Sequence, residues 1–414
     1  MRRLVAIVAV LAVCACALVG VNVGATNTIT SSAESAPYVD YPSTDEVASY
    51  DFMHAEFKAR LGLGNNTKLV FGSSELAPGG KGAAHPINLF RGKAYGLDLM
   101  TVGRAYCESF WQAMELGALA DDVKATGDNR VVIFLSMQWF TWNRDTASDL
   151  SVSFSQGAYE KLMASDTYSD ELKARITSRL ADYGIDRTSG DTPVGTAATL
   201  VDAKAQLMQK KIRLAGSLSG LGSSSVDASG GLTDEQVNGG VSDDASTTPD
   251  WATLFAEGDA EARANCTTND IGYYDVEWNK DEYNKFLAAS ATAATLSTDQ
   301  LLVDQEFEDF QMLMDVCQQA GIKPLVIIQA VKGTAYDQTA YTADIRDTYV
   351  QRVTSIAQAA GADVADFTCY DYDTYFSLDV SHPSALGSAY YSKCIYTWFN
   401  TGEVDVSAPE GLEL

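Results

Sequence analysis

Two short segments of this sequence carry residues that could act together in acyl transfer. Ser73 and Ser74 follow the apolar stretch 68–71, and Asp379 precedes His382 by three residues. A serine hydroxyl becomes a useful nucleophile when a positioned imidazole accepts its proton. The imidazole needs a carboxylate at its other nitrogen, which fixes the tautomer and stabilises the imidazolium. The residue types therefore predict a triad in which Ser74 is the nucleophile, His382 the base and Asp379 its partner.

Donors for a developing oxyanion follow the next two apolar stretches. Gly103 comes directly after residues 97–102, and Gln138 comes shortly after residues 130–135. Together with the N–H of Ser74, the Gly103 N–H and the Gln138 amide would supply two or three hydrogen bonds. Removing one such donor typically lowers a rate by about 10²–10³-fold. We therefore expect Gly103 and Gln138 to line an oxyanion site.

Each of these residues also has a plain structural interpretation. A Gly-Ser-Ser sequence after a strand is most often only a turn, a His-Pro pair can cap a helix, and Gln138 could be a structural amide. His85 is a rival base that lies closer to the serines, although no aspartate stands at short spacing from it. The joint order along the chain, serine, glycine, amide and Asp-x-x-His, favours the catalytic interpretation.

The candidate residues follow segments typical of buried strands that alternate with helices. Strands are expected at 68–71, 97–102, 130–135, 323–328 and 362–367, and helices at 45–61, 104–119, 383–399 and before Gly321. This alternation predicts an α/β fold with a parallel sheet covered by helices on both sides. Ligands of such sheets bind beyond the carboxyl ends of the strands, where the candidate residues lie.

Composition divides the chain into one α/β domain with additions. The expected parts are an anchor or signal peptide at 1–25, a tether with a first helix at 26–60, a single domain at 61–400 and a tail at 401–414. Within the domain, 155–214 is predicted to be a helical insertion. Residues 215–250 contain no aromatic residue, which predicts a disordered loop.

The N-terminus predicts export. Arg2-Arg3 precedes an uncharged apolar run of 18 residues at 4–21. As a helix this run would span about 27 Å, close to the hydrocarbon thickness of a bilayer. The arginines should stay cytoplasmic, which places the remaining chain outside. Residues 23–25 also permit a cleaved signal peptide, and a lipoprotein site at Cys14 or Cys16 is a third interpretation. The length of the run favours a single-pass N-terminal anchor in the cell membrane.

Charge and residue usage exclude several classes of protein. The 55 Asp and Glu residues outnumber the 29 Lys and Arg residues, for a formal net charge of −26. Such a surface repels phosphate backbones, so nucleic acid is not an expected partner. The chain has three histidines and lacks HExxH, CxxC and EF-hand motifs. We therefore expect no metal site and no cofactor.

Five cysteines follow the N-terminal run. In an exported protein they could form one or two disulfides, for which Cys369 with Cys394 is a candidate pair within one segment. Buried unpaired thiols are the alternative.

The order of the motifs resembles that of the SGNH hydrolase fold, a flavodoxin-like architecture. Gly72-Ser73-Ser74 stands where that fold has Gly-Asp-Ser, and Gln138 stands where it has Asn. These departures resemble the DltD family of D-alanyl-lipoteichoic acid biosynthesis. The similar segments are VFGSSEL at 70–76 with the following His85-Pro86, VIFLSMQWF at 132–140, KGTAYD at 332–337 and DVSHP at 379–383. The likeness covers most of 45–400 and excludes 215–250.

The resemblance implies an extracytoplasmic Ser-His-Asp acyltransferase that adds D-alanine esters to teichoic acid, lipoteichoic acid or a related envelope polymer. By matched position, Ser74, His382 and Asp379 would form its triad, and Gly103 and Gln138 its oxyanion site. The implied partners are a membrane-bound O-acyltransferase, a D-alanyl donor and the polymer. An esterase or thioesterase of the same fold and a non-catalytic envelope scaffold are the alternatives.

Overall fold

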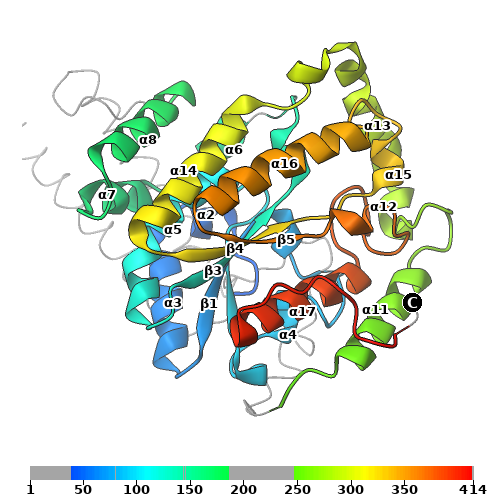
Figure 1. Cartoon of the computed structure of the whole chain (residues 1–414), viewed down its shortest axis with the longest axis horizontal. Coiled ribbons are helices and arrows are strands. Elements are labelled where there is room, and N and C mark those ends of the chain that lie inside the picture. The colour runs from blue at the N-terminus through cyan, green and yellow to red at the C-terminus, as the bar shows by residue number, and fades with distance from the viewer. Residues whose placement is uncertain (1–38, 80, 143, 145, 186–246, 413–414) are drawn as a thin grey trace, which may run out of the picture.

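The computed structural model describes residues 39–79, 81–142, 144, 146–185 and 247–412. Its centre is an all-parallel sheet with the strand order β2-β1-β3-β4-β5 (Figure 1). The strands are β1 (Thr67–Phe71), β2 (Asp98–Val102), β3 (Arg130–Leu135), β4 (Lys323–Ile328) and β5 (Asp363–Asp366). The predicted parallel α/β fold is confirmed, and this strand order is the flavodoxin-like one.

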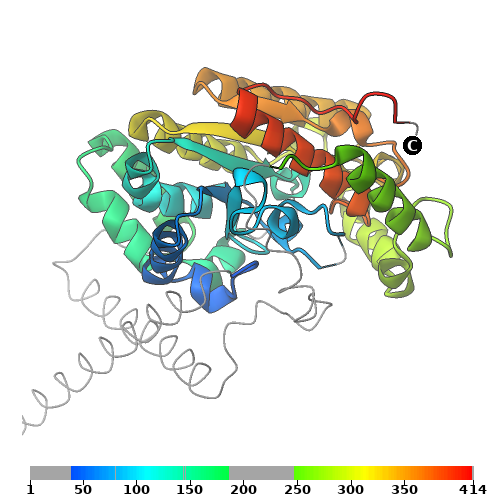
Figure 2. The same cartoon turned by 90° about the horizontal axis from the view of Figure 1, so that it is seen from below.

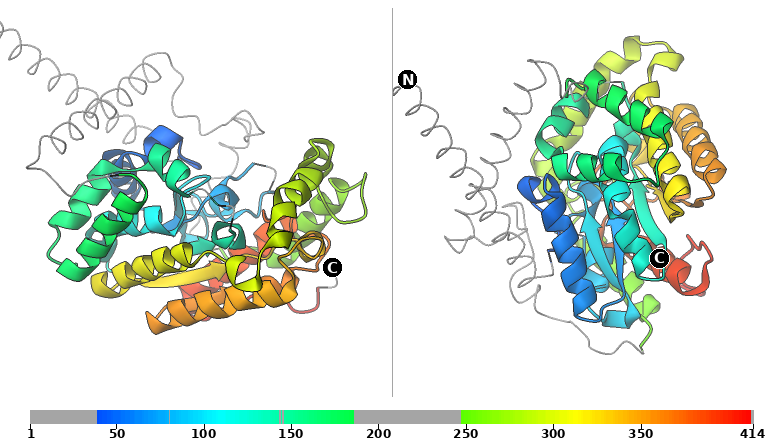
Figure 3. Two further views of the ribbon diagram at one scale, coloured as in Figure 1. Left: turned by 90° about the horizontal axis from the view of Figure 1, so that it is seen from above. Right: turned by 90° about the vertical axis from the view of Figure 1, so that its left-hand side faces the viewer.

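Helices cover both faces of the sheet. One face carries α3 (Tyr50–Gly62), α5 (Ser109–Ala125), α7 (Gln156–Ala164), α8 (Asp170–Asp182), α14 (Asp304–Ala320) and α16 (Ala343–Ala359). The other carries α4 (Pro86–Leu89), α11 (Trp251–Ala264) and α17 (Ala385–Thr401). Figure 2 shows α11 beside α17, and Figure 3 shows α14 and α16 running side by side. Short helices complete the connections: α2 (Thr44–Val47), α6 (Thr146–Ser153), α12 (Asp275–Asn279), α13 (Glu282–Ser290) and α15 (Gly333–Tyr336).

Strands β1 to β4 were predictable because both of their faces are buried. In β3, Ile133 and Leu135 pack with the α5 and α14 side, whereas Val132 and Phe134 pack with the α17 side. The sequence of a strand buried on both faces is a continuous apolar run and does not alternate between apolar and polar residues. The five observed strands accordingly begin and end within one residue of the predicted positions.

Three predicted helices differ from the observed ones at their starts. The helix expected at 45–61 is interrupted, because Ser49 leaves the helical conformation and its side chain caps the N-terminus of α3. The helix expected from Arg104 starts only at Ser109, since Tyr106 has a left-handed backbone with φ of 75°. The helix expected from Pro383 starts at Ala385 after the capping residue Ser384.

Several predictions fall on residues outside the described part of the chain. They are the anchor at 1–25, the insertion beyond residue 185 and the loop at 215–250 up to residue 246. The helices α7 and α8 lie within the range of the predicted insertion. Across the described residues, the structure contains no helix with the length and apolar character needed to cross a membrane.

The candidate disulfide between Cys369 and Cys394 is not formed, and the alternative of unpaired thiols holds for the described cysteines. Cys369 is exposed and Cys394 is buried within α17, and both are free thiols. Cys107 and Cys317 are also free and buried, so these thiols pack as small apolar groups.

Candidate active site

The structure brings together the three residues of the predicted triad. Ser74 opens the 3-10 turn η1 (Ser74–Leu76) just beyond the carboxyl end of β1, and His382 lies 308 residues later in the loop before α17. Ser74 Oγ lies 2.7 Å from His382 Nε2, and His382 Nδ1 lies 2.7 Å from Asp379 Oδ2. When Nδ1 donates its hydrogen to Asp379, Nε2 is free to accept the hydrogen of the Ser74 hydroxyl.

Asp379 also shapes the loop that carries His382. Its Oδ1 accepts hydrogen bonds from the backbone N–H groups of Ser381 at 2.9 Å and His382 at 2.8 Å. Burial alone would raise the pKa of Asp379, but the His382 imidazole and these two N–H groups lower it to about 2. The carboxylate is therefore ionised at neutral pH and holds both the backbone and the ring of His382.

Lys332 fastens the same loop to the end of β4. Its backbone N–H donates to the carbonyl of Val380 at 2.8 Å. Its buried ammonium donates to three backbone carbonyls, those of Thr374, Ile271 and Gly272. The backbone contact ties Lys332 to the Asp379 loop, and the ammonium ties it to the segments at 271–272 and 374.

The triad is accessible from solvent. The His382 side chain is 27% exposed and that of Asp379 is 16% exposed. Ser74 is partly exposed, whereas the neighbouring Ser73 is buried. A substrate carbonyl can therefore approach the Ser74 hydroxyl.

Ser73 has a different task from Ser74. Its Oγ accepts a hydrogen bond at 2.9 Å from the backbone N–H of Tyr106, the residue with the left-handed backbone. The Tyr106 ring is 53% exposed, and the Arg144 guanidinium lies 5.0 Å from its centre. Ser73 thus joins the turn after β1 to the loop after β2, and it is Ser74 that contacts the imidazole.

Glycine is required where the ends of β1 and β2 meet. Gly103 has φ of 129°, and a Cβ there would lie 2.1 Å from the carbonyl oxygen of Gly72. A Cβ on Gly72 would lie 2.3 Å from a carboxyl oxygen of Glu75. The Gly-Ser-Ser-Glu turn and Gly103 therefore pack directly against each other, which puts Gly103 beside the turn that carries Ser74.

Gln138 reaches the triad loop from the third strand. It lies in the 3-10 turn η3 (Met137–Phe140) after β3, and its Nε2 donates to Ser381 Oγ at 3.1 Å. This bond uses one of the two amide hydrogens. The structure therefore brings Gln138 against the loop of His382, with one amide hydrogen left for another acceptor.

The imidazole that contacts the Ser74 hydroxyl is that of His382 and not that of His85, the rival base. It is buried, and its Nε2 lies 3.0 Å from the backbone carbonyl oxygen of Glu75. Burial and the nearby Lys81 ammonium lower the pKa of His85 to about 3. His85 therefore supports the Ser74 turn as a neutral ring.

Two buried residues beneath the turn were not predicted. Glu75 accepts a hydrogen bond from the N–H of Ser73, and Lys81 donates to the carbonyls of Ser74 and Glu75. Glu75 directly follows the two serines in the sequence, and this adjacency could have indicated a role beside Ser74. Lys81 stands in a stretch rich in glycine, where an exposed lysine is the ordinary expectation, and nothing in the sequence distinguishes it.

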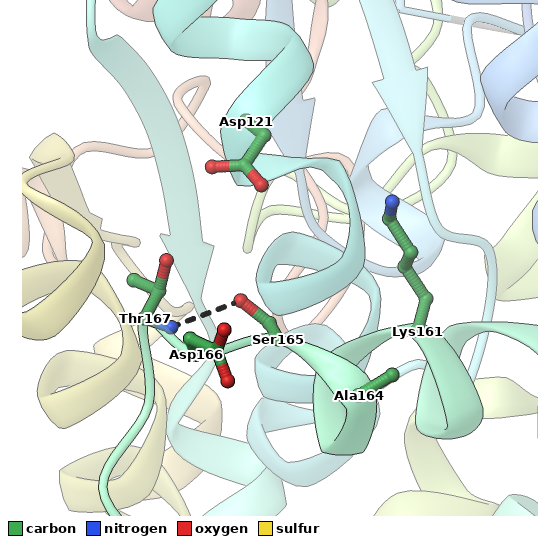
Figure 4. Close-up of a pocket in the computed structure, with 6 residues that line it drawn as sticks. All are labelled: Asp121, Lys161, Ala164, Ser165, Asp166 and Thr167. Carbon is green, nitrogen blue, oxygen red and sulfur yellow. Dashed lines mark hydrogen bonds between the residues drawn. The ribbon is translucent and has the colours of Figure 1, made fainter.

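A pocket of about 450 Å³ lies apart from the triad (Figure 4). It is formed by Asp121 of α5, Lys161 and Ala164 of α7, and the connection 165–167 before α8. None of the predicted site residues lines it, so we do not include it in the candidate site.

Comparison with known proteins identifies the same family that the sequence motifs resemble. The family model described as DltD protein matches residues 46–400. The protein DltD of Bacillus subtilis is 23% identical over 353 residues, which cover 82% of this chain and 83% of that protein. The protein DltD of Staphylococcus aureus is 21% identical over 332 residues, which cover 79% of each. The matched region includes Ser74, Asp379 and His382, and the chain therefore belongs to the DltD family.

Proposed function

We propose that this protein is a serine-dependent acyltransferase of the SGNH type that adds D-alanine esters to teichoic acid, lipoteichoic acid or a related envelope polymer. The observation that carries the proposal is the Ser74–His382–Asp379 relay, with both contacts at 2.7 Å, in a chain of the DltD family. In this proposal residues 1–25 anchor a single α/β domain at 61–400 to the outer face of the cell membrane.

The first half-reaction would acylate the enzyme. His382 Nε2 accepts the hydroxyl proton while Ser74 Oγ bonds to the carbonyl carbon of the D-alanyl donor. The N–H groups of Ser74 and Gly103 and the Gln138 amide stabilise the resulting oxyanion. As the intermediate collapses, the bond to the donor breaks and His382 gives its proton to the leaving group. The D-alanyl ester remains on Ser74.

The second half-reaction would transfer the ester to the polymer. A polymer hydroxyl gives its proton to His382 and bonds to the acyl carbon, after which the bond to Ser74 breaks. His382 then returns the proton to Ser74 Oγ. The D-alanyl donor would come from a membrane-bound O-acyltransferase that passes the acyl group across the membrane.

The test is the amount of D-alanine released from the cell envelope by mild base. A strain without this protein is complemented with the wild type, Ser74→Ala, His382→Ala or Ser73→Ala. We expect Ser74→Ala and His382→Ala to restore no ester, although both accumulate as folded protein. Ser73→Ala should retain most of the function, because it loses only the bond to Tyr106.

Each other outcome points to a different conclusion. Full restoration by Ser74→Ala would favour the envelope scaffold. An active Ser74→Ala with an inactive Ser73→Ala would move the nucleophile to Ser73. Ester content that never depends on the protein would reject D-alanylation.

An esterase or thioesterase of the same fold is the second candidate. It is favoured by the partial exposure of His382, because water can reach the base that would activate it. Purified protein given an acyl donor with and without the polymer separates the two. A transferase moves the acyl group to the polymer, whereas an esterase releases the free acid at the same rate in both mixtures.

A further inference from the structure

Lys81 is a buried lysine whose ammonium faces the residue proposed as the nucleophile. The residue is 4% exposed. Its Nζ donates to the carbonyl oxygen of Ser74 at 2.8 Å and to that of Glu75 at 2.9 Å. The Ser74 carbonyl also accepts the N–H of Ala77, which closes the 3-10 turn. The ammonium therefore holds two successive carbonyls of the turn that presents the Ser74 hydroxyl.

The surroundings of Lys81 explain how an ammonium can be buried there. Removing an ammonium from water costs free energy unless hydrogen bonds and opposite charges compensate for the loss. Burial lowers the pKa of Lys81 to about 8, against the opposing influence of the Glu75 and Asp379 carboxylates. The neutral ring of His85, the residue before α4, bonds the same Glu75 carbonyl. The Lys81 ammonium is thereby bonded to the nucleophile turn and lies close enough to Asp379 to interact with its charge.

We propose that Lys81 is a positioning residue for the reaction at Ser74. Its two hydrogen bonds fix the turn so that Ser74 Oγ points at His382 Nε2. Its charge also favours the negative charge that develops at the Ser74 end of the site in the transition state. This inference rests on the proposed role of Ser74 as the nucleophile. It assigns a role in the rate of reaction to a side chain that does not touch the substrate.

A lysine that serves only stability would behave differently, and Lys68 supplies the matched control. Lys68 is 5% exposed and lies on β1 at its amino end, the end of the strand opposite to Ser74. Its ammonium pairs with Asp128 at 2.8 Å. Lys68→Met and Lys81→Met thus each remove one buried ammonium near the same strand.

The experiment measures kcat, KM and the midpoint of thermal unfolding for the full-length protein with p-nitrophenyl acetate. We expect Lys81→Met to lower kcat by about 10²-fold with little change in KM, at a temperature where the variant is fully folded. Lys68→Met should lower the unfolding midpoint but keep kcat within about twofold of the wild type. An equal kcat loss in both variants, or a Lys81→Met variant with wild-type kcat, would overturn the inference.

Chemical rescue adds a second measurement, the kcat of a lysine-to-alanine variant with added amine. This kcat should not change if the lysine serves only stability. In Lys81→Ala, propylammonium chloride should restore part of kcat, while sodium chloride at the same ionic strength should not. Rescue also decides the matter if Lys81→Met does not fold, since the amine can be present during refolding of Lys81→Ala. Equal effects of the two salts would count against the inference.

Ser74→Ala in the same assay separates the two proposals. If Ser74→Ala is inactive and Lys81→Met is fully active, only the role of Lys81 is rejected. If Ser74→Ala is fully active, both are rejected.

Discussion

At the scale of single residues, the contact between Gly103 and Gly72 makes a sharp prediction. A methyl group on residue 103 would meet the Gly72 carbonyl oxygen at 2.1 Å, which forces the turn before Ser74 to move. A displacement of about 1 Å in a reacting group can cost about 10²-fold in rate. We therefore expect Gly103→Ala to lower kcat for ester turnover by at least about 10²-fold.

Gly127→Ala is the control for that prediction. Gly127 also has a positive φ, of 83°, but no atom lies within 4 Å of its added Cβ. It should lose about 1–2 kcal/mol of stability from backbone strain and keep its kcat. If Gly103→Ala behaved like Gly127→Ala, the packing of Gly103 on the turn would be irrelevant to the rate.

The sequence could indicate that Ser74, Asp379 and His382 lie together, but it could not indicate the residues that support them. Ser74, Asp379 and His382 stand in motifs whose order along the chain is informative by itself. Lys81 contacts the turn because the chain folds back beneath it. Since its partners are backbone carbonyls, no acidic side chain at a characteristic spacing marks it in the sequence. Positions of this kind follow only from the three-dimensional path of the backbone.

At the scale of elements, strands were predicted better than helix ends. A strand buried on both faces leaves a continuous apolar run, as in β3 and β4. Helix starts depend on single residues such as the capping Ser49 and the left-handed Tyr106, which sequence periodicity does not register. The short helix α12 was also missed, since it buries none of its residues and so has no apolar face.

Helix α5 contains a buried acid that should make stability depend on pH. Glu115 is 0% exposed, and in the described part of the chain neither of its carboxyl oxygens has a hydrogen-bond partner. Burial raises the pKa of Glu115 from 4.5 to about 8. Between these values the folded protein keeps a proton that the unfolded chain releases, so the free energy of unfolding falls as pH rises. At 1.36 kcal/mol per pKa unit, the loss from pH 4.5 to pH 7 is about 3 kcal/mol.

Urea unfolding at several pH values tests this prediction. Glu115→Gln should remove that part of the pH dependence and be more stable than the wild type near pH 7. Asp121→Asn, which changes an exposed carboxylate on the same helix, should leave the slope unchanged. A Glu115→Gln slope identical to that of the wild type would show that the acid titrates normally.

At the scale of the whole molecule, the net charge of −26 governs how an anionic polymer approaches. Repulsion between exposed charges reaches about 30 Å at 0.01 M ionic strength and about 8 Å at 0.15 M. We expect the KM for the polymer to fall several-fold over this range, while kcat/KM for the neutral p-nitrophenyl acetate stays nearly constant. A polymer KM that rises with salt would instead point to a local cationic docking patch.

On the proposed mechanism, the 308-residue separation between Ser74 and His382 has a consequence for the synthesis of the protein. The ribosome delivers the serine early and the histidine near the end, so a partly made chain carries only an ordinary alcohol at residue 74. On this mechanism Ser74 becomes reactive once α17 has docked and brought the His382 imidazole into place. A chain that stops before His382 would then lack the base that activates Ser74, so we expect such a chain to be inactive in acyl transfer.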